Sequence, residues 1–415
     1  MTSTLLTPEV AIIGGGPGGL NAAKELAGKV AGAVMVFDRE AEMGGIPRHA
    51  DHPGYGIRDK KRSYSGPKYA QILQSEAQKA GAELINHAMV HGWEDENTLL
   101  ATSPRGLLRI QAKVFLFATG ARERPRAARW ITGDRAAGIF TTGQLQNLVH
   151  IQHMPVGKRA VIVGGELVSW SAALTLQEAG CHTEALVTRY PKSEAYALFR
   201  TPGKIFFRTR VATNSKVVAL HGKPRVQSVE IEDIQSGKRS FIDCDTVIFT
   251  GDWIPDNELL RMAGVDLDAA SLSPVVNNSM QTSRPNIFTV GNINHPVETA
   301  DVVALEGEYV AERILEYLRG KQITTPELEL QVEKPLLWIS PQRFAPRGPV
   351  PARGRLVSWV DDYIGFPTVR AYQQGQKIGE KRLLWPAAPG RIFRIPAKIL
   401  QKADPAKGPV RISIS

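Results

Sequence analysis

Two stretches of the chain share one pattern of apolar and polar positions. In the first, the apolar run 10–13 enters the turn 14–19 (Gly-Gly-Gly-Pro-Gly-Gly), a helical stretch follows over 20–26, and a second apolar run, 33–37, ends at Asp38. In the second, the run 160–163 enters Gly164-Gly165, a helix extends through residue 177, and a strand covers 185–187. Strand, glycine turn, helix and strand in this order predict a βαβ unit. The chain therefore carries two dinucleotide-type units about 150 residues apart.

Later segments extend the pattern. Apolar runs at 114–117, 246–249 and 287–290 each end in small residues and predict strands, and the pattern becomes helical after Glu298. The proline-rich stretch 324–351 predicts a connection or extended arm. Short strand-like runs at 356–360, 391–395 and 410–414, separated by Gly and Pro, predict a small β-rich region.

These elements predict an α/β fold class: two Rossmann-like dinucleotide-binding domains plus a small β-rich C-terminal appendage. A chain of 415 residues is too long for one ordinary core. We expect a discontinuous first domain over 1–125 and 282–323, a second domain over 126–281, and a basic arm with the β-rich region over 324–415.

The charge is concentrated near the C-terminus. The net charge is +10, and residues 321–415 hold 16 Lys and Arg against 7 Asp and Glu, which leaves +1 for the first 320 residues. Such a region suits an acidic partner, an anionic surface or nucleic acid, or is a solvated basic face. It lacks a regular basic and aromatic stripe, so no nucleic acid is expected.

The apolar runs, the first residues and the cysteine content indicate where in the cell the protein is located. No apolar run reaches the ~18 residues of a membrane helix, so no transmembrane segment is expected. The first residues lack a basic n-region, which predicts no secretory signal. Cys181 and Cys244 form no CxxC, which excludes a sequence-adjacent dithiol relay or a zinc ribbon, and we expect no metal site. A reducing cytoplasm is the expected location.

The first glycine turn has the residues that a dinucleotide requires. Gly14 permits the tight turn, Gly16 lets the backbone approach a pyrophosphate, and Gly19 lets helix and strand pack closely. The helix N-terminus offers free N–H groups to the phosphates. Asp38, 24 residues beyond Gly14, can accept hydrogen bonds from both ribose hydroxyls. We therefore predict a nucleotide cofactor here.

The turn and its companion motifs resemble a known family. Together with Asp38 and Gly44-Gly45, the segments 118–120 (Ala-Thr-Gly) and 289–292 (Thr-Val-Gly-Asn) are similar to the two-dinucleotide-domain flavoprotein reductases, the group of the pyridine nucleotide-disulfide reductases. The segments 44–49 (Gly-Gly-Ile-Pro-Arg-His) and 141–143 (Thr-Thr-Gly) look closest to the FAD-binding α subunits of amine and imino-acid dehydrogenases, opine oxidases and hydrogen cyanide synthase. The resemblance covers roughly residues 8–320.

The resemblance implies FAD in the first domain. It assigns these cofactor-binding residues: Gly14, Gly16, Pro17, Gly19, Asp38, Arg39, Gly45, Ile46, Arg48, Val90, Thr119, Gly120, Gly291, Asn292 and Glu306. The family has an aspartate where this chain has Asn292, which can still hydrogen-bond but is uncharged. Glu306 and Gly307 are expected to open the last helix, whose N-terminal region points at the flavin in the family.

The second turn is degraded. Gly164 and Gly165 are present, but Glu166 replaces the second glycine of the motif. A glutamate there adds bulk and a charge that costs ~4 kcal/mol against each phosphate charge at ~4 Å and an effective dielectric of ~20. The turn is therefore expected to disfavour NAD(P), although a rotated side chain would evade the clash. An adenine nucleotide or NAD(P) remains a candidate ligand, and Arg189 is either a phosphate contact or a surface residue.

Candidate chemistry follows Gly44-Gly45. Among the residues here, His49 and His52 can act as general bases, and Arg48 can hold a substrate carboxylate or a reduced, anionic flavin. Alternatively, they bind FAD phosphates or pack against a loop. Some relatives carry a cysteine nearby, where this chain has Ala50.

Three functions follow from these features. The first is an FAD subunit of a hetero-oligomeric dehydrogenase or oxidase that acts on an amine, imino acid or similar small molecule. Residues 321–415 contain no cysteine, so a partner subunit would carry the second flavin, the iron–sulfur centre or both. The alternatives are a stand-alone NAD(P)H-dependent flavoprotein reductase and a non-catalytic, flavin-bearing structural subunit.

Overall fold

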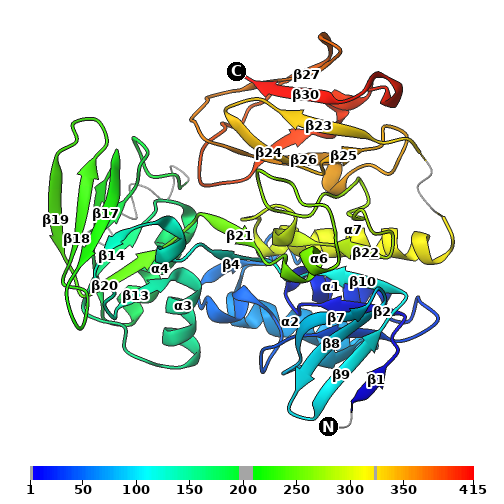
Figure 1. Cartoon of the computed structure of the whole chain (residues 1–415), viewed down its shortest axis with the longest axis horizontal. Coiled ribbons are helices and arrows are strands. Elements are labelled where there is room, and N and C mark those ends of the chain that lie inside the picture. Colours follow the sequence, from blue (N-terminus) through cyan, green and yellow to red (C-terminus); the bar gives the residue numbers. More distant parts are fainter. Residues whose placement is uncertain (1–2, 196–208, 322–324) are drawn as a thin grey trace. The chain divides into compact units, whose positions relative to one another are not determined.

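The computed structural model describes residues 3–195, 209–321 and 325–415. They form two compact units (Figure 1). The first unit comprises Met1–Arg48, Pro53–Ala121 and Pro255–Ser415, and the second comprises His49–His52 and Arg122–Ile254. Residues 255–281, predicted with the second domain, thus pack with the first unit. The strands at the crossings between the units, β11 (Ala121–Glu123) and β21 (Trp253–Pro255), pair with each other.

The first unit is built on a five-stranded parallel sheet. Its strand order is β22 (Ile287–Thr289), β10 (Val114–Phe117), β2 (Val10–Ile13), β3 (Val34–Phe37) and β6 (Glu83–Ile85). Every residue of β2, β10 and β22 is buried, as expected for a parallel sheet covered on both faces. This explains why these strands are continuous apolar runs in the sequence.

Two layers cover this sheet. Val10 and Ile12 pack in a cluster with the helices α1 (Pro17–Leu26), α2 (Gly66–Lys79) and α7 (Ala300–Leu318). Ala11 and Ile13 face the opposite way, because successive side chains of a strand alternate. They pack in a second cluster with α6 (Glu258–Met262) and an antiparallel layer of β7 (Met89–Asp95), β8 (Thr98–Ser103) and β9 (Gly106–Gln111), to which β1 (Thr4–Leu6) adds in parallel.

The last helix of this sheet begins where the pattern becomes helical, after Glu298, but the two residues expected to open it lie further inside. Glu306 and Gly307 were expected to open it, but α7 begins at Ala300, so they lie nearly two turns inside. Gly307 packs against α1, where an added Cβ would overlap the carbonyl oxygen of Gly18 and lie 3.0 Å from the nitrogen of Ala22.

The second unit repeats the architecture. Its parallel sheet has the order β13 (Ile139–Thr141), β20 (Thr246–Phe249), β14 (Arg159–Val163), β15 (His182–Val187) and β16 (Arg210–Ala212). One face packs on α3 (Thr142–Gln146), a π-helical turn (Asn147–Ile151) and α4 (Leu167–Glu178). The other faces β17 (Ser215–His221), β18 (Ser228–Asp233) and β19 (Arg239–Asp243), with β12 (Thr132–Gly133) alongside. The predicted α/β class with two dinucleotide-type folds is confirmed.

Residues 325–415 form a module of two packed sheets, here called the C-terminal module. One sheet has the order β25 (Arg343–Phe344), β23 (Leu328–Val332), β30 (Val410–Ile414), β27 (Thr368–Gln373) and β28 (Gln376–Arg382). The other consists of β24 (Leu336–Ser340), β26 (Arg355–Val360) and β29 (Phe393–Pro396). Inward-facing residues of both sheets build one apolar core, so the predicted β-rich character is confirmed.

The predicted connection over 324–351 is wrong in its described part, because it contains β23, β24 and β25; Thr324 lies outside the described residues. Pro335 and Pro341 directly flank β24, where a strand tolerates proline, and they gave the segment the composition of a linker.

Short elements complete the described chain. They are β4 (Pro53–Tyr55), β5 (Tyr64–Ser65) and the 3₁₀ turns Ile46–His49, Arg126–Arg129, Gly291–Ile293, Ala352–Gly354, Ala397–Leu400 and Pro405–Lys407. No helix within the described ranges is long and apolar enough to cross a membrane.

Candidate functional site

The first glycine turn is tightly packed on its inner side and open in front of Gly16. Gly14 has φ +105°, and an added Cβ would lie 2.5 Å from the carbonyl oxygen of Ala118. A Cβ at Gly19 would overlap the carbonyl oxygen of Gly14, whereas a Cβ at Gly16 would meet no atom within 4 Å. Pro17 opens α1, where a missing N–H costs nothing. The turn therefore leaves space where phosphate oxygens can approach the backbone.

Asp38 lies beside this turn. Its Oδ2 accepts a hydrogen bond from the backbone N–H of Gly15 at 2.7 Å, and its Oδ1 accepts one from Glu40 at 2.9 Å. Each oxygen keeps a free lone pair, so the fixed carboxylate can still accept ribose hydroxyls. Arg39 points to solvent, with 65% of its side chain exposed and only a 3.7 Å ion pair to Glu40.

The Gly44-Gly45 segment contacts the same turn. The N–H of Gly44 donates to the carbonyl oxygen of Gly15 at 2.8 Å, and Gly45, at φ +62°, would place a Cβ 3.0 Å from the Cα of Gly16. Ile46 is 55% exposed. The Arg48 guanidinium donates to the carbonyl oxygen of Glu42 at 2.8 Å and pairs with Glu40 at 3.3 Å.

The two predicted catalytic histidines belong to the other unit. His52 Nε2 lies 2.8 Å from Ser171 Oγ of α4, and the carbonyl oxygen of His49 hydrogen-bonds His150 Nδ1. The grouping of residues thus places Arg48 in the first unit and both histidines in the second. A joint catalytic role for the three stays a prediction.

The other predicted cofactor residues occupy loop and sheet positions of the first unit. Thr119 Oγ1 donates to the carbonyl oxygen of Asp256 at 2.7 Å, and the carbonyl oxygen of Gly120 accepts from the N–H of Asp256 at 2.9 Å. Val90 lies in β7 opposite Ala101, and its half-buried side chain packs against the core.

Asn292 closes the loop that leads into α7. Residues 291–299 are called the flavin loop, because we propose below that they contact the flavin. Its Oδ1 accepts the N–H of Glu298 at 2.9 Å, and its Nδ2 donates to the carbonyl oxygen of Glu298 at 3.4 Å. An amide supplies both an acceptor and a donor, whereas an ionised carboxylate supplies acceptors alone. The loop thus accounts for asparagine in place of the aspartate of the resembled family. Gly291 has φ +79°, and an added Cβ would lie 2.6 Å from Val303 Cγ1.

A buried ion pair lies behind this loop. His295 Nε2 is 3.1 Å from Glu306 Oε1, and both residues are almost fully buried. Burial lowers the pKa of His295, but the charge of Glu306, the hydrogen bond to it and the charge of Glu298 together raise it above its usual value. His295 Nδ1 and Glu306 Oε2 have no hydrogen-bond partner among the described residues. His295 was not predicted as a site residue, since nothing in the local sequence pattern connects it to Glu306, eleven positions away.

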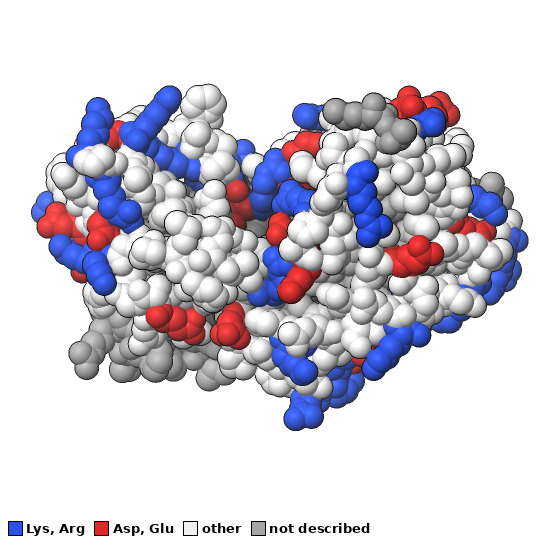
Figure 2. Space-filling view, turned by 90° about the horizontal axis from the view of Figure 1, so that it is seen from below, with Lys and Arg blue, Asp and Glu red and all other residues white. Residues whose placement is uncertain are grey.

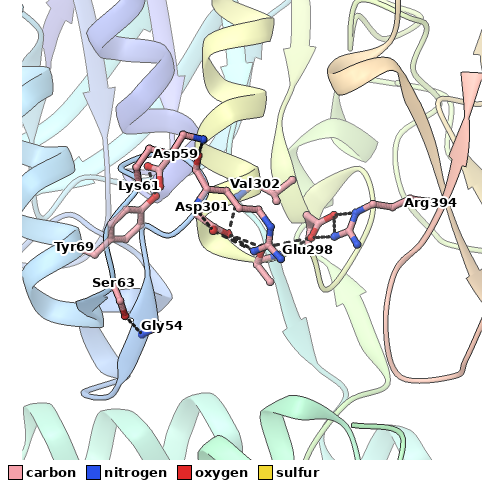
Figure 3. Close-up of polar contacts among 11 residues, drawn as sticks. Gly54, Asp59, Lys61, Ser63, Tyr69, Glu298, Asp301, Val302 and Arg394 are labelled. Carbon is pink, nitrogen blue, oxygen red and sulfur yellow. Dashed lines mark hydrogen bonds and ion pairs between the residues drawn. The ribbon is translucent and has the colours of Figure 1, made fainter. Parts of the chain in front are cut away.

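Two further carboxylates fix the start of α7 (Figure 3). Asp301 pairs with the Arg58 guanidinium at 3.1 Å and accepts the backbone N–H of Arg58 at 2.9 Å. The Glu298 side chain is 1% exposed, and its carboxylate accepts hydrogen bonds from Nε and Nη2 of Arg394, a residue of β29 in the C-terminal module. Nearby, the Tyr69 hydroxyl donates to Asp59 at 2.8 Å, and burial raises the pKa of Asp59.

The second glycine turn is filled by its own chain. Glu166 Oε2 accepts hydrogen bonds from Ser169 Oγ and Thr250 Oγ1, each at 3.0 Å. The side chain therefore folds back across the turn, where its Oε1 occupies the space that a Cβ at Gly251 would take. In a standard turn of this type the same position is glycine and stays clear for a pyrophosphate.

A second segment covers this turn from outside. Ser193 Oγ donates to the carbonyl oxygen of Gly165 at 2.6 Å, and the N–H of Ala195 donates to the same oxygen at 3.0 Å. The Glu194 carboxylate lies where a Cβ at Gly165 would be. Gly164, in the left-handed region at φ +140°, packs against Thr250. As it stands, this turn does not fit a pyrophosphate.

Glu194 is the most strongly perturbed carboxyl of this turn. Its Oε1 accepts a hydrogen bond from Thr188 Oγ1 at 2.9 Å, whereas its buried Oε2 has no partner among the described residues. Burial, and then the charge of Glu166, raise the pKa of Glu194 to about 8. Arg189, expected to be either a phosphate contact or a surface residue, is exposed, and its guanidinium carbon lies 4.9 Å from the centre of the Tyr190 ring.

Three further observations concern possible metal ligands, the thiols and the surface charge. In the described ranges no cluster of three or more His, Cys, Asp or Glu could hold a metal ion. Cys181 and Cys244 are buried and free, and burial raises the pKa of each thiol to about 12. On the face shown in Figure 2, Lys and Arg side chains lie in small groups with Asp and Glu between several of them.

A model of the family described as pyridine nucleotide-disulphide oxidoreductase matches residues 8–307. The chain belongs to this family and is an FAD-dependent oxidoreductase. The mitochondrial dihydrolipoyl dehydrogenase of Caenorhabditis elegans is 24% identical over 344 residues, covering 72% of this chain and 67% of that protein. A ferredoxin–NADP reductase of Salinispora arenicola is 28% identical over 297 residues, covering 69% and 85%.

Solved structures share the fold. Thioredoxin reductase of T. acidophilum superposes with a TM-score of 0.64 at 19% identity, covering 75% of this chain and 98% of that one. L-proline dehydrogenase from P. horikoshii gives a TM-score of 0.58 at 18% identity, covering 77% and 57%. Family membership implies binding of FAD and NAD(P). The first glycine turn has room for the pyrophosphate of a dinucleotide. The second glycine turn has none, because Glu166 and residues 193–195 occupy that space.

Proposed function

We propose that this chain is the FAD-bearing subunit of a hetero-oligomeric dehydrogenase or oxidase that oxidises an amine, imino acid or similar small molecule. The observation that carries the proposal is the contrast between the two glycine turns. Space lies open in front of Gly16, whereas Gly165 is covered by its own chain and followed by a folded-back glutamate. A self-sufficient NAD(P)H-dependent reductase needs both turns open.

In this proposal the first unit holds FAD, which accepts a hydride equivalent from the substrate when bound. The backbone of Gly14–Gly19 and the N-terminus of α1 bind the pyrophosphate. Asp38 binds the ribose, and the flavin loop with Asn292 contacts the ribityl side. Glu306 pairs with His295 inside the unit, so its role is to hold the flavin loop rather than to contact FAD directly.

The second unit serves as a folded scaffold in this proposal. Binding an adenine nucleotide or NAD(P) at its turn would require residues 193–195 to leave Gly165 and Glu166 to rotate away from Thr250. The division of the chain into an FAD domain, a second dinucleotide domain and a C-terminal region is part of the same proposal.

A partner subunit accepts the electrons in this proposal. The structural likeness to an L-proline dehydrogenase supports an amine- or imino-acid-type substrate. Because residues 321–415 contain no cysteine, thiolates of this region hold no iron–sulfur cluster. The partner therefore carries the second flavin or the cluster.

Two alternatives compete with this function. A stand-alone NAD(P)H-dependent flavoprotein reductase is favoured by the names of curated relatives, among them ferredoxin–NADP reductases. The second alternative is a non-catalytic, flavin-bearing structural subunit. It too would have a first glycine turn open to a pyrophosphate and a second one filled by its own chain.

Anaerobic titration of the purified, flavin-loaded chain separates these functions. We expect little bleaching of the flavin bands by NADH or NADPH, and reduction by candidate amines once the co-purifying subunit is present. Asp38→Ala should lose flavin, whereas Arg189→Gln should keep it. Rapid bleaching by stoichiometric NADPH would establish the stand-alone reductase. A bound flavin that no amine reduces, with or without the partner, would leave the structural subunit.

A further inference from the structure

Positive charge exceeds negative charge where the C-terminal module contacts the flavin loop. The Arg394 guanidinium is bound to both carboxylate oxygens of Glu298, and one of these oxygens also accepts the N–H of Thr299 at 2.9 Å. Glu298 is therefore fully used by Arg394 and by its own loop. Arg353 and Arg355, which flank Gly354 at the start of β26, form no ion pair with a carboxylate of the described residues.

The Arg355 side chain stacks on a ring but makes no hydrogen bond within the described part of the chain. Its guanidinium carbon lies 5.8 Å from the centre of the Trp385 ring, and the residue is half-buried. Burial and the charges of Arg353 and Arg394 lower the pKa of Arg355, and Glu298 only partly offsets them. Its guanidinium makes no hydrogen bond or ion pair with residues 3–195, 209–321 and 325–415. None of its nitrogens is among the fully buried polar atoms that lack a partner, so its acceptors are left to water or to a ligand anion.

This position is connected to the flavin loop through one residue. Glu298 accepts Arg394 with its side chain and closes the loop with Asn292 through its backbone. Figure 3 shows Arg394 and Glu298 meeting near Asp301, in the first turn of α7. The peptide dipoles of α7 place further positive potential at that end of the helix. The unpaired arginines are thus close to the segment that we propose contacts the flavin.

We propose that Arg355, supported by Arg353 and stacked on Trp385, forms a binding site for the carboxylate of a small cyclic or apolar acid. The inference rests on the proposed function and deepens it: the substrate would be an amine that also carries a carboxylate. A guanidinium fork matches a carboxylate in two parallel hydrogen bonds. The ring of Trp385 and the neighbouring Leu384, 80% exposed, supply an apolar surface for the rest of the molecule.

Cyclopentanecarboxylate, cyclopentanecarboxamide and inorganic phosphate are the probes that test this site. The first two share one shape and differ in charge, and phosphate tests whether any anion suffices. Calorimetric titration of the FAD-free chain and difference spectra of the FAD-loaded chain measure binding. We expect the carboxylate to bind and both other probes to bind at least about tenfold more weakly.

Three variants identify the group responsible. Arg355→Met keeps an unbranched side chain on Trp385 but removes the charge, and should weaken carboxylate binding about tenfold or more. Arg355→Lys keeps the positive charge but lacks the two parallel N–H donors of a guanidinium. Its affinity for the carboxylate should lie between those of the original chain and Arg355→Met. Arg105→Gln, in the exposed turn between β8 and β9, should bind like the original chain.

Binding that Arg355→Met leaves unchanged, or equal binding of the amide, would overturn the site. Tight binding of phosphate would reassign it to phosphorylated ligands. Because calorimetry on the FAD-free chain needs no redox chemistry, a flavin that NADPH reduces would refute the proposed function and leave this result standing.

Discussion

The buried carboxyl of Glu194 should make the second unit lose stability as the pH rises. The pKa of an unfolded glutamate is 4.5, and burial beside Glu166 raises it to about 8 in the fold. Between these values the folded chain keeps a proton that the unfolded chain releases. The stabilisation is therefore complete below about pH 4.5 and is lost as the pH rises through about 8.

The structure sets the size of this effect. One unit of pKa corresponds to about 1.4 kcal/mol, so a rise from 4.5 to about 8 corresponds to about 5 kcal/mol at most. Glu194→Gln retains an oxygen that accepts the Thr188 hydroxyl and replaces the ionisable oxygen with an uncharged amide. The variant should match the original chain at pH 5 and be more stable at pH 9 by about 3–5 kcal/mol, or roughly 10 °C in Tm.

Thermal unfolding of the full chain at pH 5, 7 and 9 measures this difference. Trp170 is a suitable fluorescence probe, because its Nε1 donates to Ser193 Oγ at 3.4 Å, next to Glu194. Glu178→Gln, on the surface of α4, removes a carboxylate that pairs with His150 and serves as the control. If the original chain and Glu194→Gln show parallel stability curves from pH 5 to 9, the carboxyl is not held protonated and the reasoning fails.

Three further changes test the first unit. Asn292→Asp would place a carboxylate oxygen against the carbonyl oxygen of Glu298. The variant should therefore bind FAD about tenfold more weakly in fluorescence titrations. Tighter binding of FAD would contradict this account of the loop. Arg394→Met would leave the buried Glu298 carboxylate unpaired and should lower the free energy of unfolding in urea by about 3–5 kcal/mol. Adding Glu298→Gln should recover part of this loss. If the effects of the two single variants simply add in the double variant, the two side chains do not interact. Gly307→Ala would push α7 from α1, costing about 1–3 kcal/mol and lowering flavin content; an unchanged urea midpoint would show that the contact can relax.

The cofactor turns were predictable because their signal is local. A strand, a glycine turn and a helix are adjacent in sequence, and the motif spacing itself states which backbone atoms must stay free. The replacement of a glycine by Glu166 was legible for the same reason. What the side chain does there was not, because its partners Ser169 and Thr250 come from a helix and from the end of a distant strand.

The C-terminal module was harder to predict. Its strands β23 and β30 pair Leu330 with Val410, eighty positions apart, and no local pattern identifies such partners. Pro335 and Pro341 made the segment around β24 look like a linker, although prolines at strand ends are compatible with a sheet. Strand propensity is a property of a short segment, whereas the pairing with other strands, which are distant in sequence, decides whether that segment becomes a strand.

By itself, the sequence determined the fold class, the two dinucleotide-type turns and the difference between them, since each depends on residues within one short segment. Only the tertiary structure decided which charges meet: His295 with Glu306, Arg394 with Glu298, and Glu194 with the turn it covers. It also left the guanidinium of Arg355 without a hydrogen bond to the described residues, near Arg394, which is paired with Glu298. The reason is physical: the stability and pKa of a charge depend on burial and on neighbours that folding brings from distant positions.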